Sequence, residues 1–223
     1  MNTLVLFDID GTLLDTRGAG RRAFIRGVQR IFATDDPLDY ITFAGATDLD
    51  VLERIATRNG WNLATSQVND FFGLLPGLLR EELANEAPYV FPGVRELLRA
   101  LTEHPDVTLG LVTGNIEACA WAKLEACGIH DHFELGAYGH EHADRRDIAR
   151  LARRRAEQKQ PFARRALIGD TPSDVAAALA IEARAIAVAT GGHGADALTR
   201  AGAHAVFTDL SNLDAVRAQI LAG

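Results

Sequence analysis

The most constraining feature of this chain is a pair of acidic residues directly after an apolar run near its N-terminus. The run Leu4-Val5-Leu6-Phe7 is followed by Asp8-Ile9-Asp10-Gly11-Thr12. A segment that is apolar at every position is typical of a central parallel strand buried on both faces. Ligands of open parallel sheets bind at the carboxyl ends of strands. We therefore expect the Asp8 carboxylate and the Asp10 carbonyl to approach one cation, with Gly11 allowing the sharp turn.

The composition is that of a globular protein acting on small molecules. Of the 223 residues, 48% are hydrophobic and 24% are charged, which is ordinary for a folded domain. The length suffices for one large core with an inserted module. A formal net charge of -7 opposes non-specific binding to nucleic acid or to an anionic membrane. No uncharged apolar run approaches the about 18 residues of a spanning helix, so we expect a cytoplasmic location.

The spacing of apolar residues becomes helical after the acidic turn. The residues at this spacing are Phe24, Val28, Ile31 and Phe32, followed by Leu49, Leu52 and Ile55. Ser66 is the expected N-cap of a further helix over residues 66–83, which Pro76-Gly77 should kink or split. Because no strand signal interrupts this region, an all-helical insertion at residues 15–89 is favoured over a set of core helices. The remaining residues, 1–14 and 90–223, then form the core.

Helices and short apolar strands alternate after Phe91-Pro92-Gly93. The expected strands cover residues 108–112, 133–137, 166–168, 185–189 and 205–207. The expected helices cover residues 117–126, 146–158, 173–180 and 195–201. This alternation predicts an α/β fold with a doubly wound parallel sheet, Rossmann-like in its core.

Two further strand ends carry polar residues suited to a phosphate and a metal. Thr113-Gly114-Asn115 follows one strand and precedes a helix, where a hydroxyl and free backbone N–H groups suit an anion. Asp170 and Asp174 follow another strand and supply the oxygen ligands that Mg²⁺ prefers. Taken singly, a threonine such as Thr113 is more often a cap or turn residue, and Asp170 could simply be an N-cap.

These segments resemble motifs of the haloacid dehalogenase superfamily, which consists largely of phosphatases. Residues 7–16, FDIDGTLLDT, resemble its first motif, residues 111–115 its second, and residues 169–174, GDTPSD, its fourth. The motifs follow the family order, each at an expected strand end. The resemblance implies a nucleophile at Asp8, a general acid/base at Asp10, phosphate binding by Thr113, Gly114 and Asn115, and a Mg²⁺ site formed by Asp8, Asp10, Asp170 and Asp174.

The third motif departs from the family's commonest pattern, a Lys followed by Pro. Ala143-Asp144-Arg145-Arg146-Asp147 stands in its place. We assign the phosphate-binding role to Arg145, which resembles an Arg variant of the family, with Arg146 as the alternative. An arginine offers a planar fork of donors where a lysine offers a compact ammonium.

A carboxylate nucleophile and a phosphate monoester repel each other, so the reaction requires Mg²⁺ and a basic side chain. Asp8 then forms an aspartyl-phosphate. Asp10, held close to another carboxylate, is expected to retain a proton, give it to the departing alcohol and later take one from water.

The insertion lies where the family places a mobile cap. Its expected hinges are Asp15-Thr16 and residues 89–92, and closure would exclude water from the first step. Residues 45–48, Gly-Ala-Thr-Asp, lie where related caps carry a substrate-facing loop, although a simple turn and helix cap fits the same residues.

The predicted function is a Mg²⁺-dependent phosphatase of a small organic phosphate ester, similar to phosphoglycolate phosphatases. Two alternatives remain open at this point. One is a phosphomutase of the same superfamily, which returns the phosphate to a sugar instead of water. The other is a non-catalytic binding or regulatory protein that retains the fold.

Overall fold

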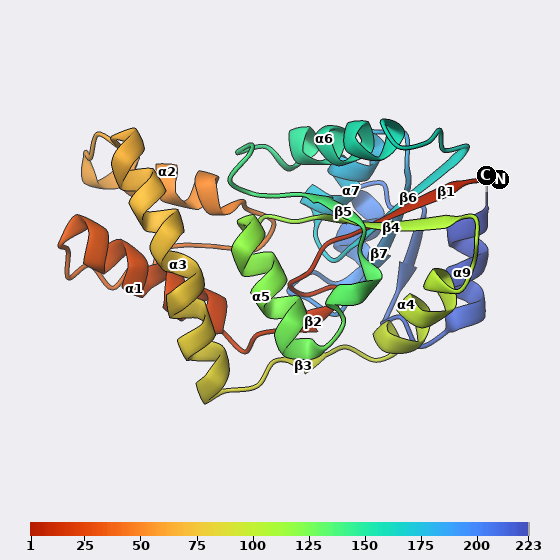
Figure 1. The fold of residues 1–223 in the computed structure, drawn as a ribbon, viewed down its shortest axis with the longest axis horizontal. Coiled ribbons are helices and arrows are strands. Elements are labelled where there is room, and N and C mark those ends of the chain that lie inside the picture. Colours follow the sequence, from red (N-terminus) through yellow and green to blue (C-terminus); the bar gives the residue numbers. More distant parts are fainter. Residues whose placement is uncertain (223) are drawn as a thin grey trace.

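A six-stranded parallel sheet with helices on both faces forms the body of the molecule within residues 1–222, the part that this computed structural model describes (Figure 1). The sheet order is β5-β4-β1-β6-β7-β8. The strands are β1 (Thr3–Phe7), β4 (Val107–Val112), β5 (Leu135–Ala137), β6 (Arg164–Gly169), β7 (Arg184–Val188) and β8 (Ala205–Phe207). The expected doubly wound α/β core is confirmed. No helix in the same range is long and apolar enough to cross a membrane.

The central strand, β1, is buried along its whole length. Val5 and Phe7 pack in one hydrophobic cluster with residues of α4 (Val94–Thr102), α5 (Glu117–Cys127) and α9 (Leu213–Leu221). Leu4 and Leu6 pack in a second cluster with α6 (Arg145–Glu157), α7 (Pro172–Leu179) and α8 (Ala195–Arg200). Figure 1 shows α6 and α4 on opposite sides of the sheet. Burial on both faces explains why β1 is apolar at every position.

The register of the central strands brings their ends to one level. Phe7 lies opposite Leu111 of β4 and Ile168 of β6. Because all three strands run in the same direction, the residues that follow them emerge at one edge of the sheet. Asp8, Thr113 and Asp170 therefore begin three neighbouring loops.

Three helices form a separate unit, which lies to the left of the sheet in Figure 1. They are α1 (Ala19–Phe32), α2 (Asp48–Asn59) and α3 (Thr65–Asn85). Their buried residues make a third hydrophobic cluster, which reaches α5 only through Ile116, Cys119 and Ala122. The chain enters and leaves this unit through two paired short strands, β2 (Leu14–Asp15) and β3 (Tyr89–Val90). This packing supports the predicted division at residues 15–89, which stays a prediction.

The helix expected over residues 66–83 differs from the prediction in two ways. Its N-cap is Ala64, not Ser66, and Gln67 Oε1 accepts the backbone N–H of Ala64 at 3.2 Å. Pro76 does not split the helix, because α3 continues through it. The apolar residues on both sides of Pro76 pack against α1, which offsets the hydrogen bond that a proline removes.

Two glycines differ in what an added Cβ would meet, and substitution by alanine tests this difference. Gly93 has a φ of 79°, and a Cβ there would lie 2.1 Å from the Leu210 carbonyl carbon, whereas a Cβ at Gly73, inside α3, would meet nothing within 4 Å. Gly93→Ala should lower the free energy of unfolding by about 2 kcal/mol or more. Gly73→Ala should raise it by about 1 kcal/mol. Urea unfolding followed by circular dichroism measures both, and shifts of the same sign would contradict the prediction.

Candidate active site

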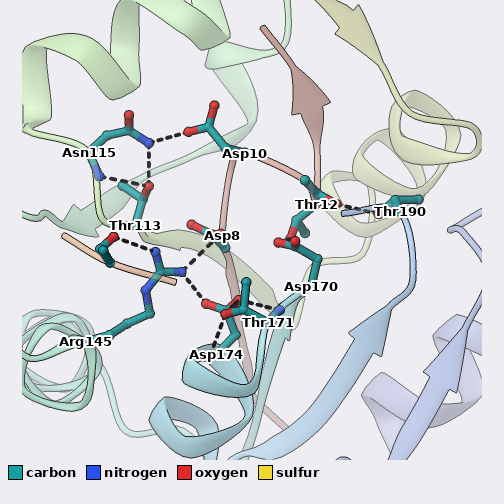
Figure 2. Close-up of polar contacts among 12 residues, drawn as sticks. Asp8, Asp10, Thr12, Thr113, Asn115, Arg145, Asp170, Thr171, Asp174 and Thr190 are labelled. Carbon is teal, nitrogen blue, oxygen red and sulfur yellow. Dashed lines mark hydrogen bonds and ion pairs between the residues drawn. The ribbon is translucent and has the colours of Figure 1, made fainter. Parts of the chain in front are cut away.

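Three buried carboxylates meet at the edge of the sheet. Asp8 follows β1, Asp170 follows β6, and Asp174 lies in the first turn of α7. One oxygen of each lies within 4.8 Å of the others, and the three residues are 3%, 4% and 1% exposed. Figure 2 shows these side chains converging from separate segments. The structure thus brings together the acidic residues that the sequence placed at different strand ends.

The crowding changes the acidity of two of these groups. Burial raises the pKa of Asp8 to about 7, with Asp174 and Asp10 adding to the effect and Arg145 opposing it. Burial also raises the pKa of Asp170 to about 8, helped by the charges of Asp174 and Asp8. Both pKa values are therefore raised chiefly by burial, and the neighbouring carboxylates add to the effect.

The guanidinium of Arg145 lies among these acids. Its Nη1 is 3.0 Å from Asp8 Oδ2 and donates a hydrogen bond to Asp174 Oδ1. Burial opposes the charge of Arg145, but Asp174 and Asp8 outweigh it and raise its pKa. Arg146 instead pairs with Asp144, and its side chain is 57% exposed. Of the two arginines considered for the third motif, only Arg145 reaches the acidic cluster.

The loop after β6 is held by two threonines. The backbone N–H and the hydroxyl of Thr171 donate to Asp174 Oδ2 at 3.0 and 2.6 Å. The hydroxyl of Thr12 donates to Asp170 Oδ1 at 3.0 Å. A Cβ at Gly191 would lie 1.8 Å from Asp170 Oδ2, so the backbone there approaches the carboxylate as only glycine permits. The acids are therefore fixed in place by their surroundings.

Asp10 has a cation as its hydrogen-bonding partner, in addition to the Asp8 carboxylate that the sequence led us to expect nearby. Lys123 Nζ, from α5, donates to Asp10 Oδ1 and Oδ2 at 2.8 and 2.6 Å and to Asn115 Oδ1 at 2.6 Å. Asn115 Nδ2 donates to Asp10 Oδ2 at 2.7 Å. These contacts pair the Asp10 carboxylate with a buried ammonium. Burial opposes the charge of Lys123, but Asp10 outweighs it and raises the pKa of the lysine.

The second predicted motif lies beside Asp10 at the start of α5. Thr113 is fully buried, and its Oγ1 accepts a hydrogen bond from Asn115 Nδ2 at 2.8 Å. A Cβ at Gly114 would lie 2.1 Å from the carbonyl oxygen of Ala46. Gly114 therefore lets the segment at residues 45–48 approach the motif.

The segment at residues 45–48 both caps a helix and contacts the sheet edge. Thr47 Oγ1 accepts the Asp50 N–H at 3.1 Å, which caps α2, and donates to the Ala143 carbonyl at 3.1 Å. Asp48 Oδ2 accepts the Ile116 N–H at 2.8 Å, at the start of α5, a helix without a side-chain cap of its own. Burial raises the pKa of Asp48 to about 6 despite this hydrogen bond.

A pocket of about 290 Å³ joins the acidic cluster to the helical unit. Its polar end contains the predicted site residues Asp8, Asp10, Thr113, Gly114, Asn115, Arg145 and Asp170. Its other wall comes from α1, α2, α3 and the segment before α2. Residues of the insertion and of the core therefore enclose one space.

Sequence reasoning missed Lys123 and made no site assignment for Asp48. Lys123 lies four residues from both Cys119 and Cys127, and all three are buried. A lone lysine in an otherwise uncharged helical stripe is a signal that would have marked it, since lysines are almost never fully buried unless paired. Asp48 carries no such signal, because its role depends on how the insertion meets the core.

Comparison with known proteins identifies the family. The family model described as haloacid dehalogenase-like hydrolase matches residues 5–188. The chain belongs to this family. One relative is the probable phosphatase IndB of Dickeya dadantii. The hydrolase is 30% identical to it over 208 residues, which are 90% of this chain and 87% of the relative. It is 27% identical over 183 residues, 80% of this chain and 76% of the relative, to the phosphoglycolate phosphatase of Agrobacterium fabrum.

Solved structures of similar fold agree with this assignment. CbbY from Rhodobacter sphaeroides in complex with phosphate superposes with a TM-score of 0.73 at 23% identity, covering 96% of each chain. A β-phosphoglucomutase-like protein from Thermotoga maritima gives a TM-score of 0.64 at 21% identity, covering 97% of this chain and 99% of that one. At these identities the likeness concerns the fold.

The contact between Asp10 and Lys123 can be tested by its effect on stability. The Lys123 side chain is 5% exposed, whereas that of Asp10 is 41% exposed and reaches the pocket. In metal-free buffer, Asp10→Asn should therefore lower the free energy of unfolding by about 2 kcal/mol or more, since it leaves a buried ammonium without its anion. Lys123→Met should cause a smaller loss, because water can solvate the Asp10 carboxylate.

The double variant Asp10→Asn/Lys123→Met completes a double-mutant cycle with the two single variants. It should be more stable than Asp10→Asn alone, because the unpaired buried charge is gone. Urea unfolding of the four proteins gives the coupling energy. Strictly additive losses would show that the two side chains do not stabilise each other.

Proposed function

We propose that this hydrolase is a Mg²⁺-dependent phosphatase that cleaves a small organic phosphate monoester through an aspartyl-phosphate at Asp8. The observation that carries the proposal is the cluster of Asp8, Asp170 and Asp174 around the Arg145 guanidinium at one end of a pocket. The names of the relatives, a probable phosphatase and a phosphoglycolate phosphatase, support the same reaction class.

The acidic cluster fits a divalent cation. It consists of carboxylate oxygens, the ligands that Mg²⁺ prefers. The three carboxylates carry more negative charge than the single guanidinium of Arg145 can balance. We propose that Asp8, Asp170, Asp174 and the backbone carbonyl of Asp10 hold Mg²⁺. When bound, the cation would neutralise the carboxylates and the phosphate and so allow them to approach each other.

Arg145 and the second motif are suited to the phosphate oxygens. Arg145, whose Nη1 is 3.0 Å from Asp8 Oδ2, supplies positive charge where the phosphate would lie. We propose that the Thr113 hydroxyl and the Gly114-Asn115 segment at the start of α5 bind further phosphate oxygens. An arginine presents two parallel donors and so fixes the orientation of the group it binds.

In the proposed reaction, an oxygen of Asp8 attacks phosphorus and the bond to the ester oxygen breaks. Asp10 acts as the general acid and gives a proton to the leaving alcohol. Water then attacks phosphorus, Asp10 accepts its proton, and phosphate leaves with Asp8 regenerated. Lys123 and Asn115 hold the Asp10 carboxylate in position.

We also propose that residues 15–89 act as a cap over a core formed by residues 1–14 and 90–223. The backbone N–H of Asp48 donates to the Gly114 carbonyl at 2.7 Å, which joins the helical unit to the second motif. The paired segments β2 and β3 are the connections across which the cap would move. Closure would exclude water while Asp8 attacks, and opening would admit substrate and release product.

The nucleophile is tested by Asp8→Asn. This variant should lower phosphate release from p-nitrophenyl phosphate by at least about 1,000-fold, because the amide is not a nucleophile. Its thermal stability in metal-free buffer should not fall, since it removes one charge from an overcrowded cluster. Retained turnover would contradict the assignment.

Inorganic phosphate as the main product of the unaltered enzyme distinguishes the phosphatase from a phosphomutase, and no turnover of any ester would favour a binding protein.

The metal site is tested by thermal unfolding with and without MgCl₂. Increasing the Mg²⁺ concentration should progressively raise the melting temperature of the unaltered protein, because only the folded state assembles the site. Asp170→Asn should remove most of this shift. Asp131→Asn is the matched control, because that side chain is 91% exposed and lies in η1 (His130–His132), a 3-10 helix outside the cluster. Equal shifts in both variants would place the cation elsewhere.

A further inference from the structure

The pocket is chemically different at its two ends. The end away from Asp8 is lined by Phe24, Phe43, Val51, Leu75, Leu79 and Cys119. The rings of Phe24 and Phe43 lie edge to face, with their centroids 5.2 Å apart. The leaving group of a phosphate held at Asp8 would extend toward these side chains, because they line the same enclosed space.

The cations that line this pocket, within the described residues, are Arg21, Lys123 and Arg145. Lys123 and Arg145 are already paired with carboxylates. The three donors of the Lys123 ammonium are directed to Asp10 and Asn115. The Arg145 guanidinium pairs with Asp8 and Asp174, next to the phosphate position.

Arg21 is the remaining cation. Its Nη1 and Nη2 donate to the carbonyl oxygens of Ile41 and Leu38 at 2.9 and 3.1 Å. Its guanidinium also lies over the Phe43 ring, 5.5 Å from the centroid. These contacts fix Arg21 to the turn that precedes α2, so that it supports Phe43 in the pocket wall.

The Asp48 carboxylate in the pocket wall acts in the same sense. Asp10 is paired with Lys123, but Asp48 also lines the pocket. A second anionic group on a substrate would meet the Asp48 carboxylate and apolar side chains, with Arg21 as the pocket cation that is held by carbonyls instead of a carboxylate. Burial of an unpaired charge is strongly unfavourable. An uncharged apolar group would instead gain from contact with the aromatic and aliphatic wall.

From this arrangement we infer that the hydrolase takes phosphate monoesters whose leaving group is an uncharged, largely apolar alcohol, and rejects esters that carry a carboxylate or second phosphate. This inference rests on the proposed phosphatase function and narrows its substrate class. A volume of about 290 Å³ restricts that class to small alcohols, of the size of a branched aliphatic chain or one ring. Phosphoglycolate lies outside it.

Two esters of almost the same shape test the inference. Isobutyl phosphate has two methyl groups where phosphoglycolate has the two carboxylate oxygens. With Mg²⁺, kcat/KM for isobutyl phosphate should exceed that for phosphoglycolate by at least about 10-fold. Equal values, or a preference for phosphoglycolate, would overturn the inference. If Arg21→Gln removed such a preference, Arg21 would be the partner of the carboxylate.

Two buried valines provide the matched variants. Val51, in α2, lines the pocket, whereas Val28, in α1, belongs to the same hydrophobic cluster but does not line it. Val51→Thr introduces a hydroxyl at nearly constant volume and should lower kcat/KM for isobutyl phosphate by about threefold to tenfold. The value for phosphoglycolate should not fall. Val28→Thr should leave both values unchanged in protein that remains folded by circular dichroism, and equal losses in the two variants would overturn the assignment of Val51.

Turnover of p-nitrophenyl phosphate separates this inference from the proposed function. If that ester yields phosphate but isobutyl phosphate is not preferred over phosphoglycolate, the phosphatase proposal stands and the substrate class is wrong. If none of the three esters yields phosphate, the proposed function itself fails.

Discussion

The whole site depends on an imbalance of buried charge. Asp8, Asp170 and Asp174 share a small volume with one guanidinium, that of Arg145. Burial and mutual repulsion of these carboxylates are unfavourable for the folded protein, and they raise the pKa of Asp8 and Asp170. The surrounding fold therefore has to hold the acids together, and the hydrogen bonds from Thr12 and Thr171 contribute to this.

The parallel sheet makes this arrangement possible. Because β1, β4 and β6 are adjacent and end at one level, residues more than 100 positions apart in sequence reach a common point. The burial of β1 on both faces fixes its register, since a shift by one residue would exchange the side chains of its two faces. The position of the Asp8 carboxylate is thus determined by the packing of Leu4, Val5, Leu6 and Phe7.

Much of this was predictable from the sequence, because the strand ends combine apolar runs with acidic or hydroxyl residues within a few positions. Asp8, Thr113 and Asp170 were placed by such local patterns. The choice between Arg145 and Arg146 could not be made from a local pattern, since it depends on which face of α6 packs on the sheet. Lys123 was missed because its partner, Asp10, is 113 residues away. The continuity of α3 through Pro76 likewise depends on packing against α1, which outweighs the local effect of a proline.

The two ends of the pocket place different demands on the chain. The proposed phosphate end needs fixed charges, and these come from strand ends and helix starts that the sheet holds rigidly. The other end comes from α1, α2 and α3, which are packed around a hydrophobic cluster of their own. A substitution such as Val51→Thr can change the surface offered to the leaving group without moving Asp8 or Arg145. On the proposed function, the reaction and the choice of substrate are therefore separable in this fold, and the Asp10–Lys123 contact lies between the two ends of the pocket.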